Sequence, residues 1–352
     1  MGYFGDEATR SRLEFGRGEF TGAIGDSVTV IPLIVAMALL TDVSLPHVLV
    51  GFGVFQIVWG VAYGLPVSVE PMKALAALAI AGALTYAELA LAGLALAVVL
   101  LAIGLSGTLA AVERWIGDPV IRGIQFAVGL ILLETGVRIG LEDPLFGAAG
   151  LAIAGLAVVA ACVAIAAWPA GVPTPTRPGA PPVPDLASAV GWNAAEGTFA
   201  QLAMTVGNAA LATSLLFADR FGAEVSADDL STSMGLTNLL AVPMGAIPMC
   251  HGCDGVAGKH AFGARTGGAN VLIGVGYLGA ALVATPALLA AFPISMVGAV
   301  LAVVAVSLGR AVEESSNLPL SVGIGALALV TNLGVAFLLG VAADLAWARL
   351  GQ

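Results

Sequence analysis

The stretch GAIPMCHGCDGVAGKHAFGARTGG, residues 245–268, decides the fold of this chain. It lies between long apolar segments, yet it contains two histidines, two cysteines, an aspartate, a lysine and an arginine. Ionisable groups at membrane depth are costly, so they usually face a cavity or a pathway. Pro248 and the glycines also interrupt a helix that the flanking residues would otherwise continue. The stretch therefore predicts a broken membrane helix that carries a functional site.

A second stretch, YGLPVSVEPMKALAAL at residues 63–78, has the same design: an extended piece bounded by prolines, followed by an apolar helix start. Two interrupted apolar segments at matching places in two halves are the best sequence indication of a transporter's binding site. An internal duplication supports this interpretation. Four pairs of residues share one offset of 182 positions: Pro66 and Pro248, Gly25 and Gly207, Asp26 and Asn208, Gly53 and Gly235.

The composition is that of a polytopic membrane protein. Of 352 residues, 59% are hydrophobic and only 10% are charged, whereas a soluble domain has roughly 25% charged residues. A net charge of −10 argues against nucleic acid as a partner, because that needs a basic face. Three cysteines do not make a disulfide framework. The chain's two lysines, Lys73 and Lys259, each fall in one interrupted stretch, although chance in a lysine-poor chain explains this equally well.

Hydropathy predicts ten to twelve apolar segments. Arginines in the polar residues 1–18 favour a cytoplasmic N-terminus, and we expect no signal peptide there. The prolines of 171–185 predict an extended, solvated linker between the halves. The expected apolar segments are 20–40, 46–64, 88–105, 119–140, 145–168, 192–217, 230–246, 270–291, 294–308 and 319–350, the last with a possible break at 332–334, and the expected short pieces are 74–83 and an amphipathic 109–117.

Several segments resemble the signature sequences of the molybdate transporter family, a branch of the sulfate permease superfamily. The Pro-Met-Cys-His-Gly run followed by Phe-Gly-Ala-Arg-Thr-Gly, within residues 245–268, is the most specific of them. The resemblance extends over both halves of the chain from residue 20 onward. The other segments are FTGAIGDSVTVIP at 20–32, GLPVSVEPMKALAALAI at 64–80, QLAMTVGNA at 201–209 and GLTNLLAVPMGAIP at 235–248.

The resemblance implies an all-α polytopic membrane protein of two inverted seven-segment repeats, with core and gate domains and two half-helices that meet near the membrane midplane. It also implies a homodimer, and we expect no STAS domain after residue 350. Because 352 residues are few for fourteen full crossings, we expect some segments to be short. The expected divisions are a cytoplasmic segment 1–18, core 19–107 and 191–291, gate 108–170 and 292–352, and a Pro-rich linker 171–190.

A tetrahedral dianion that enters such a site must exchange its water for protein donors. Two half-helix N-termini, one near 69–71 and one near 253–255, would supply backbone N–H groups and a partial charge of about half a unit each. Pro71 suits the first turn of such a helix, and Gly252 and Gly255 would let the backbone approach closely. The candidate substrate-binding residues are Thr21, Asp26, Ser68, Val69, Glu70, Gln201, Thr205, Asn208, His251, Gly252, Cys253 and Asp254.

Several of these residues have a structural alternative. His251 and Asp26 could each cap or bridge helices instead of contacting substrate. Cys250 and Cys253 have metal-ligand spacing, but a closed zinc site needs a second ligand pair, so we expect no metal and no cofactor. Lys259 and Arg265 are expected to be anchors at a membrane interface.

The sequence therefore predicts a secondary transporter of a tetrahedral oxyanion, with molybdate as the leading candidate, in the cell membrane. Sulfate or tungstate transport and a nucleobase permease of the same fold are alternatives, and an intramembrane enzyme is the least favoured. Glu70 stands where the family has Gln, and Cys253-Asp254 replaces small residues. Because a bound dianion would repel these carboxylates, Glu70 and Asp254 are candidates for proton coupling. A permanent ion pair between Glu70 and Lys73, three residues on, is an equally weighted alternative.

Overall fold

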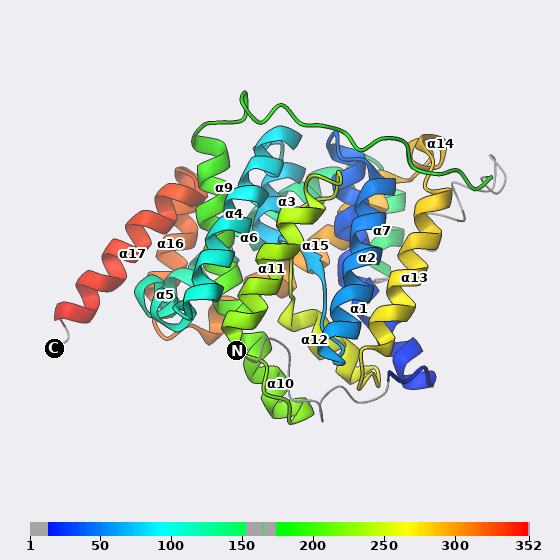
Figure 1. Cartoon of the computed structure of the whole chain (residues 1–352). Helices are drawn as coiled ribbons and strands as arrows, with labels where there is room; N and C mark the ends of the chain where they lie inside the picture. Colours follow the sequence, from blue (N-terminus) through cyan, green and yellow to red (C-terminus); the bar gives the residue numbers. More distant parts are fainter. Residues whose placement is uncertain (1–12, 153–163, 165–173, 351–352) are drawn as a thin grey trace.

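The protein folds into helices that run between two opposite faces, with a short pair of strands in the interior (Figure 1). The computed structural model describes residues 13–152, residue 164 and residues 174–350. The first half contains α1 (Arg17–Leu40), α2 (Leu45–Tyr63), β1 (Glu70–Pro71), α3 (Lys73–Ile80), α4 (Tyr86–Ser106), α5 (Leu109–Ile116), α6 (Asp118–Gly140) and α7 (Pro144–Ala152). The second half contains α9 (Trp192–Met204), the π-helix η1 (Thr205–Ala212), α10 (Thr213–Phe221), α11 (Ala227–Ala241), β2 (Met249–Cys250), α12 (Cys253–Ala261), α13 (Gly268–Val283), α14 (Pro286–Ala290), α15 (Ile294–Arg310), the 3₁₀ turn η2 (Ala311–Glu314), α16 (Leu318–Val330) and α17 (Leu333–Leu350).

Six helices in the described residues are long and apolar enough to cross a membrane. They are α1, α2, α4, α6, the continuous α9–η1–α10 and the continuous α15–η2. A helix needs about 20 apolar residues to span the hydrocarbon core, and α3 and α12 are far shorter. The chain is therefore a multi-pass membrane protein with two half-length helices, as the sequence predicts.

Each half-helix begins at the strand pair in the interior. β1 and β2 are antiparallel, with Glu70 opposite Cys250 and Pro71 opposite Met249. Beyond the strands, the Met72 N–H donates to the Pro248 carbonyl at 3.0 Å. The pairing brings the starts of α3 and α12 side by side, and the two helices leave it toward opposite faces (Figure 1).

The two halves of the chain exchange their packing partners. α12 of the second half packs against α1 of the first, and α3 of the first half packs against α9 of the second. In the same way α2 packs on α13 and α4 packs on α11. The duplicated glycines mark these contacts: a Cβ on Gly53 would lie 2.9 Å from the Gly274 carbonyl oxygen, and one on Gly235 would lie 2.9 Å from that of Ala97. Small residues allow such close helix crossings in membranes, and the reciprocal packing is that of inverted repeats.

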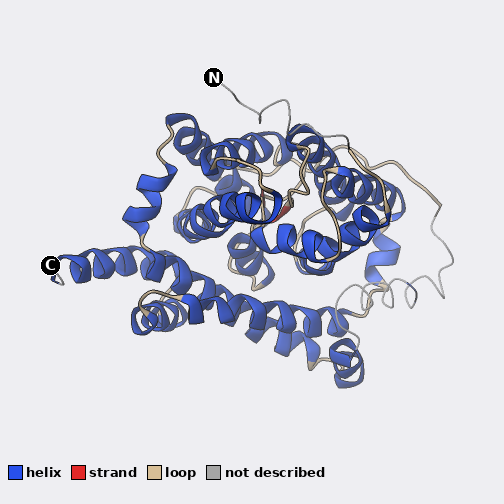
Figure 2. Cartoon of the chain, turned by 90° about the horizontal axis from the view of Figure 1, so that it is seen from below, coloured by secondary structure: helices blue, strands red, loops and turns tan. Residues whose placement is uncertain are grey.

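The remaining long helices form a second group. α6 packs along α15 and contacts α16, α7 contacts α15, and α16 contacts α17. Gly136 and Gly298 bring α6 and α15 together, since a Cβ on either would lie 2.7 Å from the other's carbonyl oxygen. Seen from below, the chain's C-terminal end projects at one side of the molecule and the strands lie among the other helices (Figure 2).

The chain between the halves crosses one face of the molecule. The Thr176 N–H donates to the Leu282 carbonyl at 2.7 Å, and Tyr86 donates through its hydroxyl to the Pro182 carbonyl at 3.4 Å. These contacts hold the described part of the Pro-rich segment over the ends of α4 and α13, where most of its residues are exposed. The segment appears as the long green loop across the top of Figure 1.

Three features differ from the sequence expectations. The predicted single segment 270–291 is wrong, because α13 ends at Val283 and the Thr285 hydroxyl caps a separate helix α14 that starts with Pro286. Pro71 does not open a helix; it lies in β1, since Met72 is still extended and α3 begins at Lys73. The π-helix η1 had no sequence signal that we could recognise. The segment 145–168 lies mostly outside the described residues, whereas the possible break at 332–334 is confirmed between α16 and α17.

Candidate functional site

The starts of the two half-helices are joined by one lysine. Lys73, the first residue of α3, has its Nζ 3.1 Å from Glu70 Oε2 and 2.7 Å from Asp254 Oδ2 in the first turn of α12. The Glu70 carboxylate is buried, with 1% of the side chain exposed, whereas that of Asp254 is 57% exposed. Among the described residues, Glu70 Oε2 is one of few buried oxygens without a well-aligned hydrogen bond. Glu70 is therefore held mainly by charge, which is the ion-pair alternative considered from the sequence.

Glycines at the start of α12 allow the Glu70 carboxylate to lie against the helix terminus. A Cβ on Gly252 would lie 2.0 Å from the Glu70 carboxyl carbon, and one on Gly255 would lie 2.3 Å from Glu70 Oε1. Real Cβ atoms do not approach so closely, so a side chain at either position would require the Glu70 carboxylate to move away from the start of α12. The sequence predicts that these glycines let an anion approach the backbone closely, and the anion that approaches in this structure is the chain's own carboxylate.

A second lysine lies deeper in the same region. Lys259, two turns along α12, is fully buried and pairs with Asp26 Oδ2 at 3.2 Å. Asp26 in turn accepts a 2.5 Å hydrogen bond from the Ser68 hydroxyl, which also reaches Glu70 Oε1 at 3.3 Å. The expectation that Lys259 is an interface anchor is therefore wrong, because α12 runs between α1 and the segment before β1. Arg265 is exposed and donates to the carbonyls of its own loop.

His251 bridges two elements. Its Nδ1 donates to the Ser68 carbonyl at 3.0 Å, and its Nε2 lies 2.7 Å from the Ser233 hydroxyl on α11. The rings of Trp59 and Tyr63 meet its ring edge to face. Both ring nitrogens are thus engaged by the protein, so the bridging alternative describes His251 in this structure.

The amide and hydroxyl candidates of the second half lie near the start of α3. Gln201 Oε1 accepts the Ala74 N–H of α3 at 2.9 Å, and its Nε2 donates to Thr205 at 2.9 Å. Thr205 and Asn208 belong to the π-helix η1, and π-helical turns occur often at functional sites. Gln201 therefore already satisfies one N–H of the α3 terminus, while Asn208 lines the cleft described next.

A narrow cleft opens at the half-helix starts. Its volume is about 10 Å³, room for about one water molecule. It is lined by Glu70, Lys73, Gln201, Met204, Asn208, Ala209, Cys250 and Gly252.

A polar cavity of about 410 Å³ lies next to this cleft, and Asn208 lines both. Cys253 and Asp254 of α12 form one wall, and Arg122 of α6 and Arg310 of α15 belong to the opposite wall. The larger cavity thus lies between the two groups of helices and is bounded by the start of α12.

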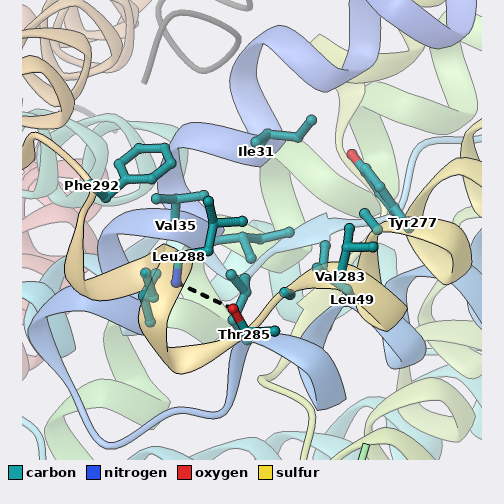
Figure 3. A pocket seen from close by; sticks show the side chains of 13 residues that line it. Ile31, Val35, Leu49, Tyr277, Val283, Thr285, Leu288 and Phe292 are labelled. Carbon is teal, nitrogen blue, oxygen red and sulfur yellow. Dashed lines mark hydrogen bonds between the residues drawn. The ribbon is translucent and has the colours of Figure 1, made fainter. Parts of the chain in front are cut away.

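A third cavity, of about 240 Å³ between α1, α2, α13 and α14, is apolar (Figure 3). Its walls include Ile31, Val35, Leu288 and Phe292. The hydroxyl of Thr285, which also lines the cavity, caps α14 and accepts the Leu288 N–H at 3.2 Å. Because burial of a charge requires paired or hydrogen-bonding partners, this cavity does not suit an oxyanion.

Most of the predicted site residues therefore lie together, and one does not. Thr21 is exposed and donates to the carbonyls of Arg17, Gly18 and Phe262, at the far end of α12 from Glu70. Val69 takes part in the hydrogen bonding of this region through its main-chain carbonyl, which accepts from the Gln56 amide nitrogen at 3.2 Å. Sequence reasoning did not include Lys73 and Lys259, or their partners Gln56 and Asn270, among the site residues. The position of both lysines in interrupted stretches was a usable signal, whereas nothing local distinguished Gln56 or Asn270.

Comparisons with known proteins agree on the class of this chain. It is 28% identical to molybdate transporter 1 of Arabidopsis thaliana, over 88% of this chain and 81% of that protein. It is 26% identical to molybdate transporter 1 of Chlamydomonas reinhardtii, over 92% and 90% of the two chains.

Solved structures show the same fold. The transmembrane domain of a cyanobacterial bicarbonate transporter, BicA, superposes with a TM-score of 0.64 at 16% identity, over 97% of this chain and 98% of that one. The murine anion transporter Slc26a9, in the inward-facing state, gives 0.66 at 13% identity, over 97% and 69%. At these identities the likeness concerns the fold alone, which is a membrane fold of inverted repeats with core and gate domains.

The family model described as "Molybdate transporter of MFS superfamily" matches residues 18–132 and 193–308. These ranges contain both strands and both half-helices, and therefore also Lys73 and Lys259, which belong to the half-helices. They make up more than half of the chain, which therefore belongs to this molybdate transporter family, a family of membrane anion transporters and not of enzymes.

Proposed function

We propose that the protein is a secondary active transporter of molybdate that works by alternating access. The observation that carries the proposal is the meeting of two half-helix N-termini around Lys73, beside a polar cavity between the two helix groups. Molybdate is the proposed substrate because two relatives of this chain are named molybdate transporters. Half-helix termini that point into a site at the repeat interface are how transporters of inverted-repeat design hold anionic groups.

The substrate takes the place of a carboxylate. A cleft with room for about one water is too small for a tetrahedral oxyanion, so side chains must move before it binds. The Lys73 ammonium is the fixed cation, and Asp254, which is mostly exposed, is the partner that leaves most readily toward the polar cavity. The dianion then receives donors from Lys73, from the N–H groups at the start of α12 and from Asn208.

Proton coupling follows from the charges at the site. Lys73 already lies between two carboxylates, so adding a dianion would leave three uncompensated negative charges in a poorly hydrated place. Such an arrangement is costly unless carboxylates take up protons. Glu70, which faces Lys73, Ser68 and the first turn of α12, accepts a proton as the anion binds and releases it on the other side. Inward uptake is then driven by acid outside.

The moving parts are the two helix groups. The core comprises 19–107 and 191–291, the gate comprises 108–170 and 292–352, and 171–190 links the repeats. Sliding of the core along α6 and α15 alternately opens the polar cavity to each side. The protein is a homodimer through its gate in the cell membrane, with a cytoplasmic N-terminus.

Uptake into proteoliposomes that contain the purified protein tests this function. Labelled molybdate should accumulate in a saturable way, faster when the outside is more acidic than the inside, and unlabelled molybdate should compete better than sulfate or uracil. Competition by uracil alone would indicate the nucleobase permease of the same fold. Isothermal titration with molybdate, tungstate and sulfate ranks the oxyanions, and non-saturable uptake that ignores the proton gradient would indicate a passive channel instead.

A further inference from the structure

The ammonium group of Lys259 lies inside a cage of oxygen atoms. Its Nζ is 2.8 Å from the Val67 carbonyl oxygen, 3.1 Å from Asn270 Oδ1, 3.2 Å from Gln56 Oε1 and 3.2 Å from Asp26 Oδ2. These oxygens come from α1, α2, α13 and the extended segment before β1. Four separate parts of the fold therefore converge on one nitrogen atom.

The cage is held together independently of the lysine. The Gln56 amide nitrogen donates to Asp26 Oδ2 at 3.1 Å and to the Val69 carbonyl at 3.2 Å. The Asn270 amide nitrogen donates to Gln56 Oε1 at 2.6 Å and to the Val67 carbonyl. Because the amide nitrogens donate to other oxygens, three of them members of the cage, both amide oxygens are left to accept from Lys259 Nζ.

The oxygen atoms of the cage are also suitable ligands for a metal ion, and the single carboxylate among them matches the single charge of an alkali-metal ion. A carboxylate, two amide oxygens and a main-chain carbonyl are the hard oxygen ligands that alkali and alkaline-earth cations take in proteins, and carbonyls of unwound segments hold coupling cations in transporters. An ammonium has only three N–H groups, yet four oxygens surround this one. The cage therefore offers more ligands than lysine can use with full hydrogen bonds.

The cage is also connected to the substrate site. Asp26 contacts Lys259 through Oδ2 and accepts the Ser68 hydroxyl through Oδ1 at 2.5 Å, and Ser68 lies 3.3 Å from Glu70. A positive charge at the cage thus compensates Asp26 and holds Ser68 beside the half-helix starts. All of these side chains are buried, so water does not screen the Asp26 charge and a compensating cation must lie within the cage itself.

We propose that Lys259 is a tethered cation that fills an alkali-metal site built into the fold, so that transport needs no Na⁺ or K⁺ and removal of the ammonium opens a site for Na⁺. The cage stands apart from the carboxylates that carry the proposed proton coupling. It rests on the proposed function only where uptake is used as a readout.

Two variants of the full chain test the proposal. Lys259→Ala empties the cage, and Lys259→Met fills it with an uncharged side chain of similar length. Thermal unfolding of the purified proteins is measured in NaCl, in methylammonium chloride and in N-methyl-D-glucamine chloride at equal ionic strength. The Ala variant should be stabilised by Na⁺ and by methylammonium, with a midpoint that rises with the logarithm of the cation concentration. The Met variant and the wild type should show no such dependence.

Molybdate uptake gives the second readout. The wild type should transport equally in Na⁺ and in N-methyl-D-glucamine, whereas the Ala variant should transport several-fold faster in Na⁺ and the Met variant should not recover. Three results would overturn the proposal: equal stability of the Ala variant in all three media, failure to recover it folded in any of them, or a wild type that requires Na⁺. If the cation stabilises the Ala variant but no form of the protein takes up molybdate, the cage stands and the proposed function fails.

Discussion

At the scale of single residues, the main feature of the candidate site is a pair of lysines, each of which contacts a buried carboxylate. Lys73 lies between Glu70 and Asp254, and Lys259 lies in the oxygen cage around Asp26. A buried charge persists in a membrane protein when it is paired, and the carboxylate partners of each lysine account for its burial. They differ in access: the exposed partner Asp254 makes Lys73 available to an anion, whereas Lys259 is enclosed.

Lys73→Met should weaken molybdate binding about ten- to a hundred-fold, because a hydrogen bond to a charged group contributes about 1.5–3 kcal/mol. Isothermal titration of the purified variant measures the change. Arg265→Met is the matched control, since Arg265 is an exposed cation of the neighbouring loop and its removal should leave affinity unchanged. Equal affinities of the Lys73 variant and the wild type would remove Lys73 from the site.

Glu70→Gln should bind molybdate at least as well as the wild type, because it removes a negative charge beside the anion. Its uptake should no longer increase when the outside is acidified, since the group that carries the proton is gone. The wild type should respond to acid, because protonation is required for the dianion to bind. Initial rates across a series of external pH values measure this. Unchanged pH dependence in both Glu70→Gln and Asp254→Asn would exclude both carboxylates as the coupling group.

At the scale of elements, the decisive feature is the start of α12 against β1. Two glycines there have no room for a side chain, because the Glu70 carboxylate lies against the first turn. Strands β1 and β2 fix this approach through the pairing of Glu70 with Cys250. The proposed anion site is thus the space between two helix termini and cannot be assigned to one residue.

Gly252→Leu should abolish molybdate binding while the protein remains folded and membrane-inserted, because the side chain would take the space of Glu70 and of any anion at the helix start. Binding is measured by titration and folding by size-exclusion profile and helical circular dichroism. Gly276→Leu on α13 is the control, since a Cβ at Gly276 has no atom within 4 Å. Retained binding in the Gly252 variant would relocate the site.

At the scale of the whole molecule, two groups of helices meet across a polar cavity. Gly207 of η1 faces Ile121 of α6, so that a Cβ on Gly207 would lie 2.8 Å from the Ile121 side chain. This is a direct contact between the proposed core and the proposed gate. In alternating access such contacts must change as the two groups slide.

A disulfide between Gly207→Cys and Ile121→Cys, in a background without the native cysteines, should stop molybdate uptake, and reduction should restore it. The reason is that the bond fixes η1 to α6 and prevents sliding. Gly53→Cys with Leu278→Cys joins α2 to α13 within the core, where a Cβ on Gly53 would lie 2.8 Å from the Leu278 side chain, and should leave uptake intact. Full uptake by the core-to-gate cross-linked protein would argue against rigid-body movement.

The sequence by itself determined the membrane class, the two broken helices and their duplication. Hydropathy, Pro and Gly act locally, so residues 63–78 and 245–268 indicated interrupted helices without knowledge of their neighbours. The duplicated Gly53 and Gly235 indicated two equivalent halves for the same reason. The family signature likewise consists of short contiguous segments, and the match over both halves confirmed it.

Only the tertiary structure decided which charges meet. Lys73 and Asp254 are 181 positions apart, and Lys259 reaches Asp26 only because α12 packs against α1, a helix of the other repeat. The same crossings leave Thr21 outside the site, bring Gln56 and Asn270 into the cage, and press Glu70 against α12. Pairing of buried charges depends on how helices from distant parts of the chain cross, and no local pattern of residues contains that information.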